Sequence, residues 1–176
     1  MAVALRPVQS SDLDAIFEQM RDPASIHLAA FTAEDPDDRA AFDEHVSRNS
    51  ASPGVTQRAV TDDGLFVGTV ASFPSEGFLE VTYWIDRAHW GRGIASAALA
   101  LLLAEVSERP IRARVASDNA ASRRVLEKSG FVDVATEVSY APGRGRAIDE
   151  TIFELREGAR RAGPPGAAFV RASPHR

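Results

Sequence analysis

The chain has 176 residues, of which 44% are hydrophobic and 26% charged, a formal net charge of −5, and no cysteine. This length suits one domain with a buried core, and the composition is that of a globular protein, not a disordered or membrane-spanning one. Without cysteine, disulfides, thiolate metal sites and a cysteine nucleophile are excluded, the acidic balance gives no reason to expect nucleic-acid binding, and four scattered histidines lack metal-ligand spacing.

We expect residues 1–157 to form a single domain and residues 158–176, which are rich in arginine, proline and glycine, to be a disordered tail. No apolar run of signal-peptide length precedes Arg6 and Pro7, and no long uncharged run follows. The cytoplasm is therefore the expected compartment, with no membrane partner.

The first half of the chain predicts a strand, two helices and then a three-strand meander. Ser10 to Asp12 are N-cap residues before apolar positions at helical spacing, and Asp62-Asp63-Gly64 is a hairpin signal. The predicted elements are a strand at 3–5, a helix through 13–20, a helix after Asp35-Pro36 with a stripe of Ala40, Ala41, Phe42 and Val46, and strands at 56–61, 65–73 and 78–85.

The second half predicts a strand-helix-strand unit followed by two final strands. An apolar stripe at helical spacing begins at Ile94 and continues through Ala97, Ala98, Leu101, Leu102 and Val106. Further elements are a strand at 111–116, a helix capped by Asn119 and ending near Lys128, and strands at 131–140 and 147–155. The order indicates a mixed α/β (α+β) fold.

A glycine turn, Gly91-Arg92-Gly93, separates the strand at 78–85 from the helix that starts at Ile94. The first amides of a helix lack intrahelical partners and lie at the positive end of its dipole, so they bind anions. Glycine lets the backbone approach an anion closely, and Arg92 adds a positive charge. We interpret the turn as a phosphate or pyrophosphate site, although a glycine turn without any ligand would give the same local pattern.

Two other phosphate motifs fit this turn poorly. A dinucleotide-binding fingerprint would need a third glycine where the chain has Ser96, and it would open the fold instead of following several strands. A P-loop would need Gly-Lys-Ser/Thr, which is missing here.

Two separated motifs resemble the GNAT superfamily of acetyl-CoA-dependent acyltransferases, and within it the branch of ribosomal-protein N-terminal alanine and serine acetyltransferases. The first is EVTYWID at 80–86 followed by HWGRGIA at 89–95; the second is Asn119-Ala-Ala-Ser122 leading to LEKSGF at 126–131. The resemblance implies a mainly antiparallel central sheet flanked by about four helices, with two splayed strands forming a cleft for acetyl-CoA.

In that cleft, between residues 79–85 and 111–116, the pantetheine arm would lie like an added strand. The resemblance also implies that a backbone N–H near 83–85 meets the thioester carbonyl and that Asn119 and Ser122 contact the cofactor. Arg87, Arg123 and Arg124 are candidates for the adenosine 3′-phosphate. The full set of predicted cofactor-binding residues is Trp84, Ile85, Gly91, Arg92, Gly93, Ile94, Ala95, Ser96, Asn119 and Ser122.

Direct transfer to an amine needs a base for the amine proton and donors for the developing oxyanion. Glu80, on the strand that flanks the cleft, is the candidate base; a solvent-facing strand glutamate is the alternative. His27 is a second candidate that would bind or deprotonate the acceptor. Tyr83 and Trp84 are expected to pack in the sheet, and Tyr140 to lie on the acceptor side.

Two positions depart from the family pattern. Trp90 replaces the glutamine or arginine that opens the broader phosphate motif, and Leu126 replaces the tyrosine that often protonates coenzyme A. The acid is therefore unassigned. We predict an N-acetyltransferase that acts on a small-molecule or peptide amine through a ternary complex, and that forms a homodimer; the alternative is a non-catalytic acyl-CoA-binding module.

Overall fold

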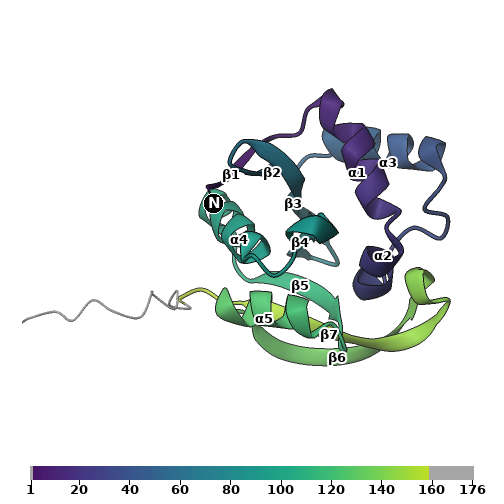
Figure 1. The fold of residues 1–176 in the computed structure, drawn as a ribbon. Coiled ribbons are helices and arrows are strands. Elements are labelled where there is room, and N and C mark those ends of the chain that lie inside the picture. Colours follow the sequence, from purple (N-terminus) through teal and green to yellow (C-terminus); the bar gives the residue numbers. More distant parts are fainter. Residues whose placement is uncertain (1, 159–176) are drawn as a thin grey trace, which may run out of the picture.

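The computed structural model describes residues 2–158, which form a seven-stranded sheet with helices on both faces (Figure 1). The strands are β1 (Val3–Pro7), β2 (Thr56–Asp62), β3 (Leu65–Ser75), β4 (Phe78–Ile85), β5 (Ile111–Ala116), β6 (Val132–Ala141) and β7 (Arg146–Leu155). The α-helices are α1 (Leu13–Met20), α2 (Pro23–Ala29), α3 (Arg39–Ala51), α4 (Ile94–Glu105) and α5 (Ala120–Lys128), and the 3-10 helices are η1 (Ser10–Asp12), η2 (Arg87–His89) and η3 (Pro142–Arg144).

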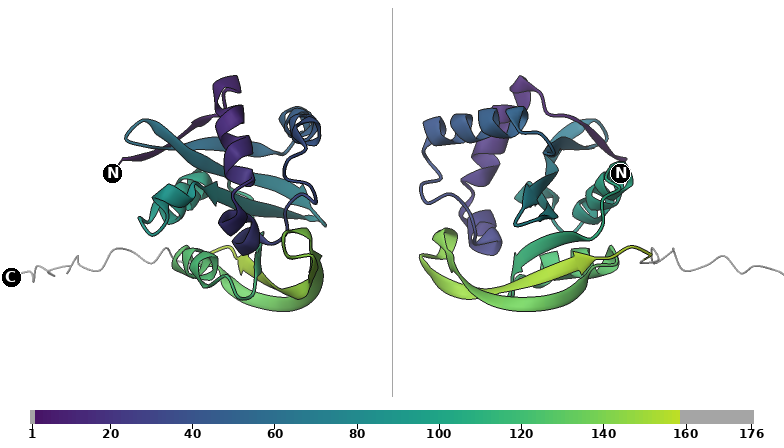
Figure 2. Two further views of the ribbon diagram at one scale, coloured as in Figure 1. Left: turned by 45° about the vertical axis from the view of Figure 1, so that its right-hand side comes forward. Right: turned by 180° about the vertical axis from the view of Figure 1, so that it is seen from behind.

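The sheet runs in the order β1-β2-β3-β4-β5-β7-β6, and within residues 2–158 the β4–β5 pair is parallel while the other pairs are antiparallel. Helices α4 and α5 cover one face, and α1, α2 and α3 lie on the other (Figure 2). This arrangement confirms the predicted mixed fold. It carries five α-helices in the described residues instead of about four.

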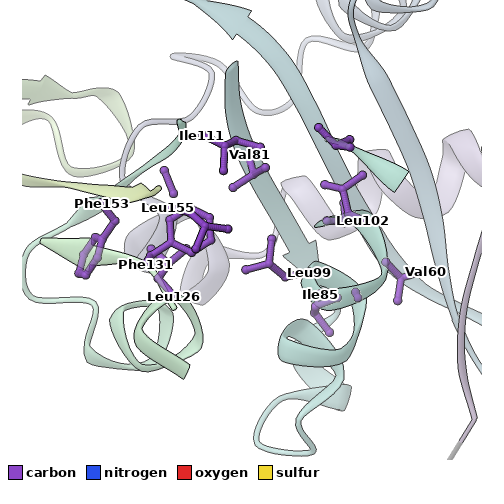
Figure 3. Close-up of a cluster of buried hydrophobic side chains, with 14 of the residues drawn as sticks. Val60, Val81, Ile85, Leu99, Leu102, Ile111, Leu126, Phe131, Phe153 and Leu155 are labelled. Carbon is purple, nitrogen blue, oxygen red and sulfur yellow. The ribbon is translucent and has the colours of Figure 1, made fainter. Parts of the chain in front are cut away.

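The main core lies between the sheet and the two helices α4 and α5 (Figure 3). Leu99 and Leu102 of α4 and Leu126 of α5 pack against Val81 and Ile111 of the central strands, and all five are nearly or fully buried. Because side chains alternate across a strand, the residues of β4 that follow each core position point to the opposite face. Glu80 and Trp84 therefore lie on the face covered by α1, α2 and α3.

Sequence patterning missed α2 entirely. Asp22 caps this seven-residue helix by accepting a hydrogen bond from the Ser25 amide at 2.9 Å, and Pro23 occupies its first turn. These are sequence signals for a helix start, but a helix of two turns has no repeating apolar stripe that would distinguish it from a loop.

Two predicted apolar stripes are wrong in detail. In α4 the buried positions are Ile94, Ala98, Leu99 and Leu102, whereas the predicted Leu101 is 39% exposed. This helix is apolar around its whole circumference, so periodicity alone could not show that Leu99 is buried in place of Leu101. In α3 no residue is fully buried, and Phe42 is half-buried beside Phe17 of α1 with ring centroids 5.2 Å apart.

The two central strands diverge soon after they meet. β4 and β5 pair only at Leu79 with Ile111 and at Glu80 with Arg112, although both strands continue for several residues. Gly68 of β3 lies against the far end of β4, where a Cβ would overlap the Trp84 carbonyl oxygen. The backbone edges of β4 after Val81 and of β5 after Arg112 thus face each other without pairing, and this splay is where the predicted cleft falls.

Candidate functional site

The N-terminus of α4 opens at the wide end of the splay and has no capping side chain. Gly93 is its N-cap, with a left-handed φ of 78°, and the first intrahelical bond runs from the Ala97 amide to the Gly93 carbonyl at 3.1 Å. The amides before Ala97 therefore lack helical partners. We call Gly91–Ser96 the anion loop, because its free amides and the helix dipole attract negative charge.

Two polar side chains in and beside the anion loop, those of Arg92 and Trp90, already form hydrogen bonds within the protein. The Arg92 guanidinium donates to Asp62 at 2.7 Å, and the Asp62 side chain is only 6% exposed. The Trp90 indole N–H donates to the Ile85 carbonyl at 2.7 Å. Trp90 thus closes the loop onto β4 in place of the polar residue expected there, and anion binding rests on the backbone.

The register of β4 decides which of its amides face the splay. The Asp86 amide donates to the Val67 carbonyl on β3 at 2.8 Å, and alternate residues of an antiparallel pair point their N–H groups to the same neighbour. The Trp84 amide therefore points to β3, while those of Tyr83 and Ile85 point into the splay; the Val81 amide is used in the pairing of Glu80 with Arg112. This register supports Ile85 and not Trp84 as a backbone donor to a ligand.

The Trp84 side chain is also used elsewhere, because its indole N–H donates to the Gln19 carbonyl of α1 at 3.2 Å. Trp84 thus joins β4 to the helices of the opposite face. The prediction that it packs in the sheet agrees with this contact.

The second wall of the splay is the turn from β5 into α5. The Asn119 Oδ1 atom accepts from the Ser122 amide at 3.1 Å and caps α5, while its Nδ2 donates to the Leu28 carbonyl at 3.0 Å. The Ser122 hydroxyl lies 2.7 Å from the Tyr83 hydroxyl. Asn119 thus caps α5 beside Ser122, as predicted, and also links α2 to this wall, while contact of the two residues with the cofactor stays a prediction.

Glu80 belongs to a group of charges at the narrow end of the splay, on the sheet face that α1, α2 and α3 cover. Its Oε1 atom accepts from the Arg114 Nε at 3.1 Å, and Arg114 also pairs with Glu76, Glu137 and Glu150. Burial lowers the pKa of Arg114, but its carboxylate partners, Glu80 and Glu137 first among them, raise it by more. The pKa of Arg114 therefore lies above its ordinary value. We call Arg114 and these four glutamates the Arg114 cluster; it holds four carboxylates and one guanidinium.

Within this cluster the carboxylates of Glu80 and Glu150 are buried, each residue being 6% exposed, whereas the side chains of Glu76 and Glu137 are exposed to solvent. The second oxygen of Glu80, Oε2, accepts no hydrogen bond from a residue in the described part of the chain. Glu80 is therefore oriented by one oxygen and able to accept a proton on the other.

The exposed His27 is not part of this cluster. It lies in the last turn of α2, where its carbonyl accepts from the Arg144 Nε at 2.7 Å. Arg144 of η3 also holds Asp118 through two bonds of 2.6 and 2.8 Å, and these bonds lower the pKa of Asp118. In the described residues no hydrogen bond or ion pair joins His27 to Glu80.

The three arginines considered for the adenosine 3′-phosphate differ in the contacts that they already make within the protein. Arg123 donates to the Thr151 hydroxyl at 2.9 Å and lies near Phe153, and Arg87 pairs with Asp22 at 3.4 Å. Arg124 is exposed and has no partner in residues 2–158. Arg124 is the candidate that could reach a phosphate without losing an existing contact.

Sequence reasoning missed Arg114 and treated Tyr83 as a packing residue. Arg112 and Arg114 alternate with the buried residues Ile111, Ala113 and Val115, so the pattern did show a strand with one charged face. It could not show that four glutamates from four other segments converge on Arg114. A cavity of about 350 Å³ lined by Glu18, Asp22, Asp86 and neighbours lies at the other end of β4 from Glu80.

No helix in residues 2–158 combines the length and apolar character needed to cross a bilayer. The same residues contain no group of three or more histidine or acidic side chains that could hold a metal ion.

Comparisons with known proteins agree on one family. A family model described as an acetyltransferase (GNAT) domain matches residues 3–132. An uncharacterized N-acetyltransferase from Bacillus licheniformis is 31% identical over 83 residues, which are 45% of this chain and 47% of the relative, so the match spans about half of that relative's length.

Solved structures resemble the whole domain. Mycobacterium smegmatis RimJ in complex with CoA-disulfide has a TM-score of 0.73 and 25% identity, with 88% of this chain and 82% of that chain covered. Spermidine N-acetyltransferase from Vibrio cholerae, in complex with CoA and spermine, has a TM-score of 0.77 and 19% identity, covering 89% and 96%.

Proposed function

Because the chain belongs to the GNAT acetyltransferase family, we propose that it transfers the acetyl group of acetyl-CoA to a primary amine by direct attack. One observation carries this proposal: a splay between β4 and β5 has unpartnered helix amides at its wide end and a buried, oriented carboxylate, Glu80, at its narrow end. The cysteine-free chain offers no thiol for an acyl-enzyme.

The residues present fit the donor. Acetyl-CoA, when bound, supplies an activated acetyl thioester whose sulfur is the leaving group. The amides of the anion loop would hold its diphosphate, with nothing in the described structure within 4 Å of where a Cβ would stand on Gly91 or Gly93. The inward-facing amides of Tyr83 and Ile85 would pair with the pantetheine arm and its acetyl group as a neighbouring strand does.

The same geometry revises the position of the oxyanion donor. Ile85 is five residues from Glu80, about 16 Å along the strand, so one acetyl group cannot be near both. The Val81 amide is used in the parallel pairing of Glu80 with Arg112, so the Tyr83 amide is the first inward-facing N–H beyond the paired residues. We assign the Tyr83 amide to the negative charge that develops on the carbonyl oxygen, and Ile85 to the pantetheine arm.

Glu80 would then receive the amine proton on Oε2 while Arg114 holds Oε1. The new bond joins the amine nitrogen to the acetyl carbon, the carbon–sulfur bond breaks, and the sulfur leaves with its electron pair. The Arg114 cluster has four carboxylates for one guanidinium, which supports an acceptor that carries positive charge near its reacting amine. A cytoplasmic location and a homodimeric state of the protein remain predictions.

Thiol release from acetyl-CoA tests the proposal directly, because a thiol reagent can report only coenzyme A in a chain without cysteine. The acceptors to compare are polyamines, free amino acids, aminoglycosides and peptides that begin with Ala, Ser or Met. We expect release that depends on a cationic acceptor. Binding of acetyl-CoA without release for any acceptor would support the non-catalytic module, and absence of binding would contradict the assignment of the anion loop.

A further inference from the structure

A strained turn follows helix α2. The Phe31 amide donates to the Ala29 carbonyl at 2.7 Å, so Ala30 is the centre of a γ-turn, with a φ of 65° and a ψ of −50°. A γ-turn with a positive φ is rare and strained, and it persists only where the surrounding structure fixes it. Ala30 is fully buried, so such surroundings are present.

Two distant segments hold this turn in place. The side chains of Arg144 in η3 and of Asn119 at the start of α5 donate to carbonyls in the last turn of α2, at 2.7 and 3.0 Å. The Gly143 amide donates to the Ala30 carbonyl at 2.8 Å, and a Cβ on Gly143 would lie 2.9 Å from that same oxygen. The direction in which the chain presents the next residue, Phe31, is therefore fixed by tertiary contacts.

The Phe31 side chain lies on the sheet face that α1, α2 and α3 cover. It is half-buried and packs against a small apolar cluster that includes Ala116 of β5 and Ile148 of β7. Along β5, Ala116 and Arg114 alternate with the core residue Val115, so these two side chains point to the same face. The ring of Phe31 thus lies beside the Arg114 cluster.

Phe31 also lies near the level of the reacting acetyl group. Glu80 pairs with Arg112 in the parallel register of β4 and β5. Counted from that pair, Ala116 lies one residue, roughly 3 Å, beyond the level of the Tyr83 amide assigned to the oxyanion. Because Glu80, the proposed base, is on the face of Phe31, the amine must approach from that face. The ring is therefore placed to contact the carbons next to the reacting amine.

Two other aromatic side chains do not compete for this contact. Phe42 of α3 is already covered by Phe17 and by the guanidinium of Arg39. Tyr140, for which the sequence predicts the acceptor side, alternates along β6 with Ser139, whose hydroxyl bonds Glu150 of the Arg114 cluster. Tyr140 therefore points to the opposite face of the sheet, and that prediction is wrong.

We propose that Phe31 determines acceptor specificity: its ring packs on the hydrocarbon chain of an alkylamine while the Arg114 cluster attracts the ammonium group. An aromatic ring gains free energy by burying hydrocarbon, and its face also attracts a cation. This inference rests on the proposed function and adds to it a preference for acceptors with a carbon chain beside the amine.

The test compares propylamine with hexylamine, which carry the same charge and differ in chain length. Their binding to the complex of the protein with coenzyme A is titrated by NMR. The wild type should bind hexylamine about tenfold more tightly, because the longer chain leaves water to pack on the ring. In Phe31→Ala this preference should fall to about twofold or less, with the Kd for coenzyme A unchanged. Phe31→Leu, which restores an apolar side chain, should recover most of it.

Tyr140→Ala is the matched control: it removes an aromatic ring that is 61% exposed on the other face, and it should keep the preference. Nuclear Overhauser contacts between hexylamine and the Phe31 ring test the same placement in the wild type without any substitution. The inference is overturned if these contacts are absent, if the wild type has no preference, or if Phe31→Ala keeps it. Failure of the proposed function is distinguishable, because acetyl-CoA would then release no thiol while amine binding still depended on Phe31.

Discussion

The anion loop and the Arg114 cluster lie at opposite ends of the same splay and consist of different chemical groups. The anion loop binds through backbone amides, and Arg92, the loop residue with a charged side chain, is tied to Asp62. The Arg114 cluster consists of side-chain charges from β4, β5, β6, β7 and the β3–β4 turn. Backbone recognition tolerates many side chains, whereas the charge cluster depends on each of its members, so the two ends should respond differently to substitution.

The largest effect is expected at the base. Replacing Glu80 by glutamine (Glu80→Gln) keeps the hydrogen bond to Arg114 but removes the proton acceptor, so kcat should fall about a hundredfold or more. Acetyl-CoA affinity, measured by calorimetry, should stay the same because the anion loop is untouched.

Glu137→Gln is the control for this change, because Glu137 also bonds Arg114 but its side chain is 53% exposed. An equal loss of kcat in both variants would mean that the charge of the whole cluster matters and that Glu80 is not the base.

The next largest effect concerns stability. Arg114→Met would leave the buried carboxylates Glu80 and Glu150 without their cation, so the free energy of unfolding in urea should fall by about 3 kcal/mol. Arg48→Met breaks an exposed pair with Glu44 on α3 and should cost about 0.5 kcal/mol or less. Similar losses in the two variants would show that the Arg114 cluster behaves as an ordinary surface network.

A smaller effect is expected in the anion loop. Gly93→Val places a branched side chain at a φ of 78°, which costs about 1–3 kcal/mol and distorts the free amides, so the Kd for acetyl-CoA should rise about tenfold to a hundredfold. Gly77→Val imposes the same strain at a φ of 81° in the turn before β4. That control should lose stability without losing affinity; equal affinity in both variants would contradict the loop assignment.

The smallest effect is a difference at high pH. The pKa of Tyr83 is raised from 10 to about 12 in the folded protein, so the unfolded chain releases this proton first. The stabilising contribution is complete below pH 10 and is lost as the pH rises through 12. The wild type should therefore lose up to about 2 kcal/mol more than Tyr83→Phe between these values, measured by denaturant unfolding. If the free energy of unfolding changed with pH in the same way in both proteins, the Tyr83 hydroxyl would be in contact with water.

Much of the fold was predictable because its signals are local. The Asp62-Asp63-Gly64 turn and the strands on either side of it were identified, and the fold class is confirmed. Helix α2 was missed because two turns carry no apolar stripe, and in α4 Leu101 was predicted to be buried instead of Leu99 because every side of that helix is apolar. The predicted disordered tail at 158–176 falls, except for residue 158, outside the residues that the structure describes.

The candidate site divides in the same way. Gly91, Gly93 and the start of α4 were identified because an anion site made of consecutive amides is contiguous in the chain. The pairing of Glu80 with Arg114, the bond from Tyr83 to Ser122 and the clasp of Arg144 on Asp118 join residues 26 to 39 positions apart. No spacing rule predicts such contacts.

The sequence by itself determined the family, the order of the elements and the turn that would hold an anion, because these depend on local backbone preferences and short motifs. Only the tertiary structure decided that Trp84 points its amide to β3, that the first free amide facing the splay is that of Tyr83, and that the Tyr83 hydroxyl bonds Ser122. The physical reason is that strand register and side-chain direction are set by pairing between distant segments, and a shift of one residue would reverse every one of these assignments.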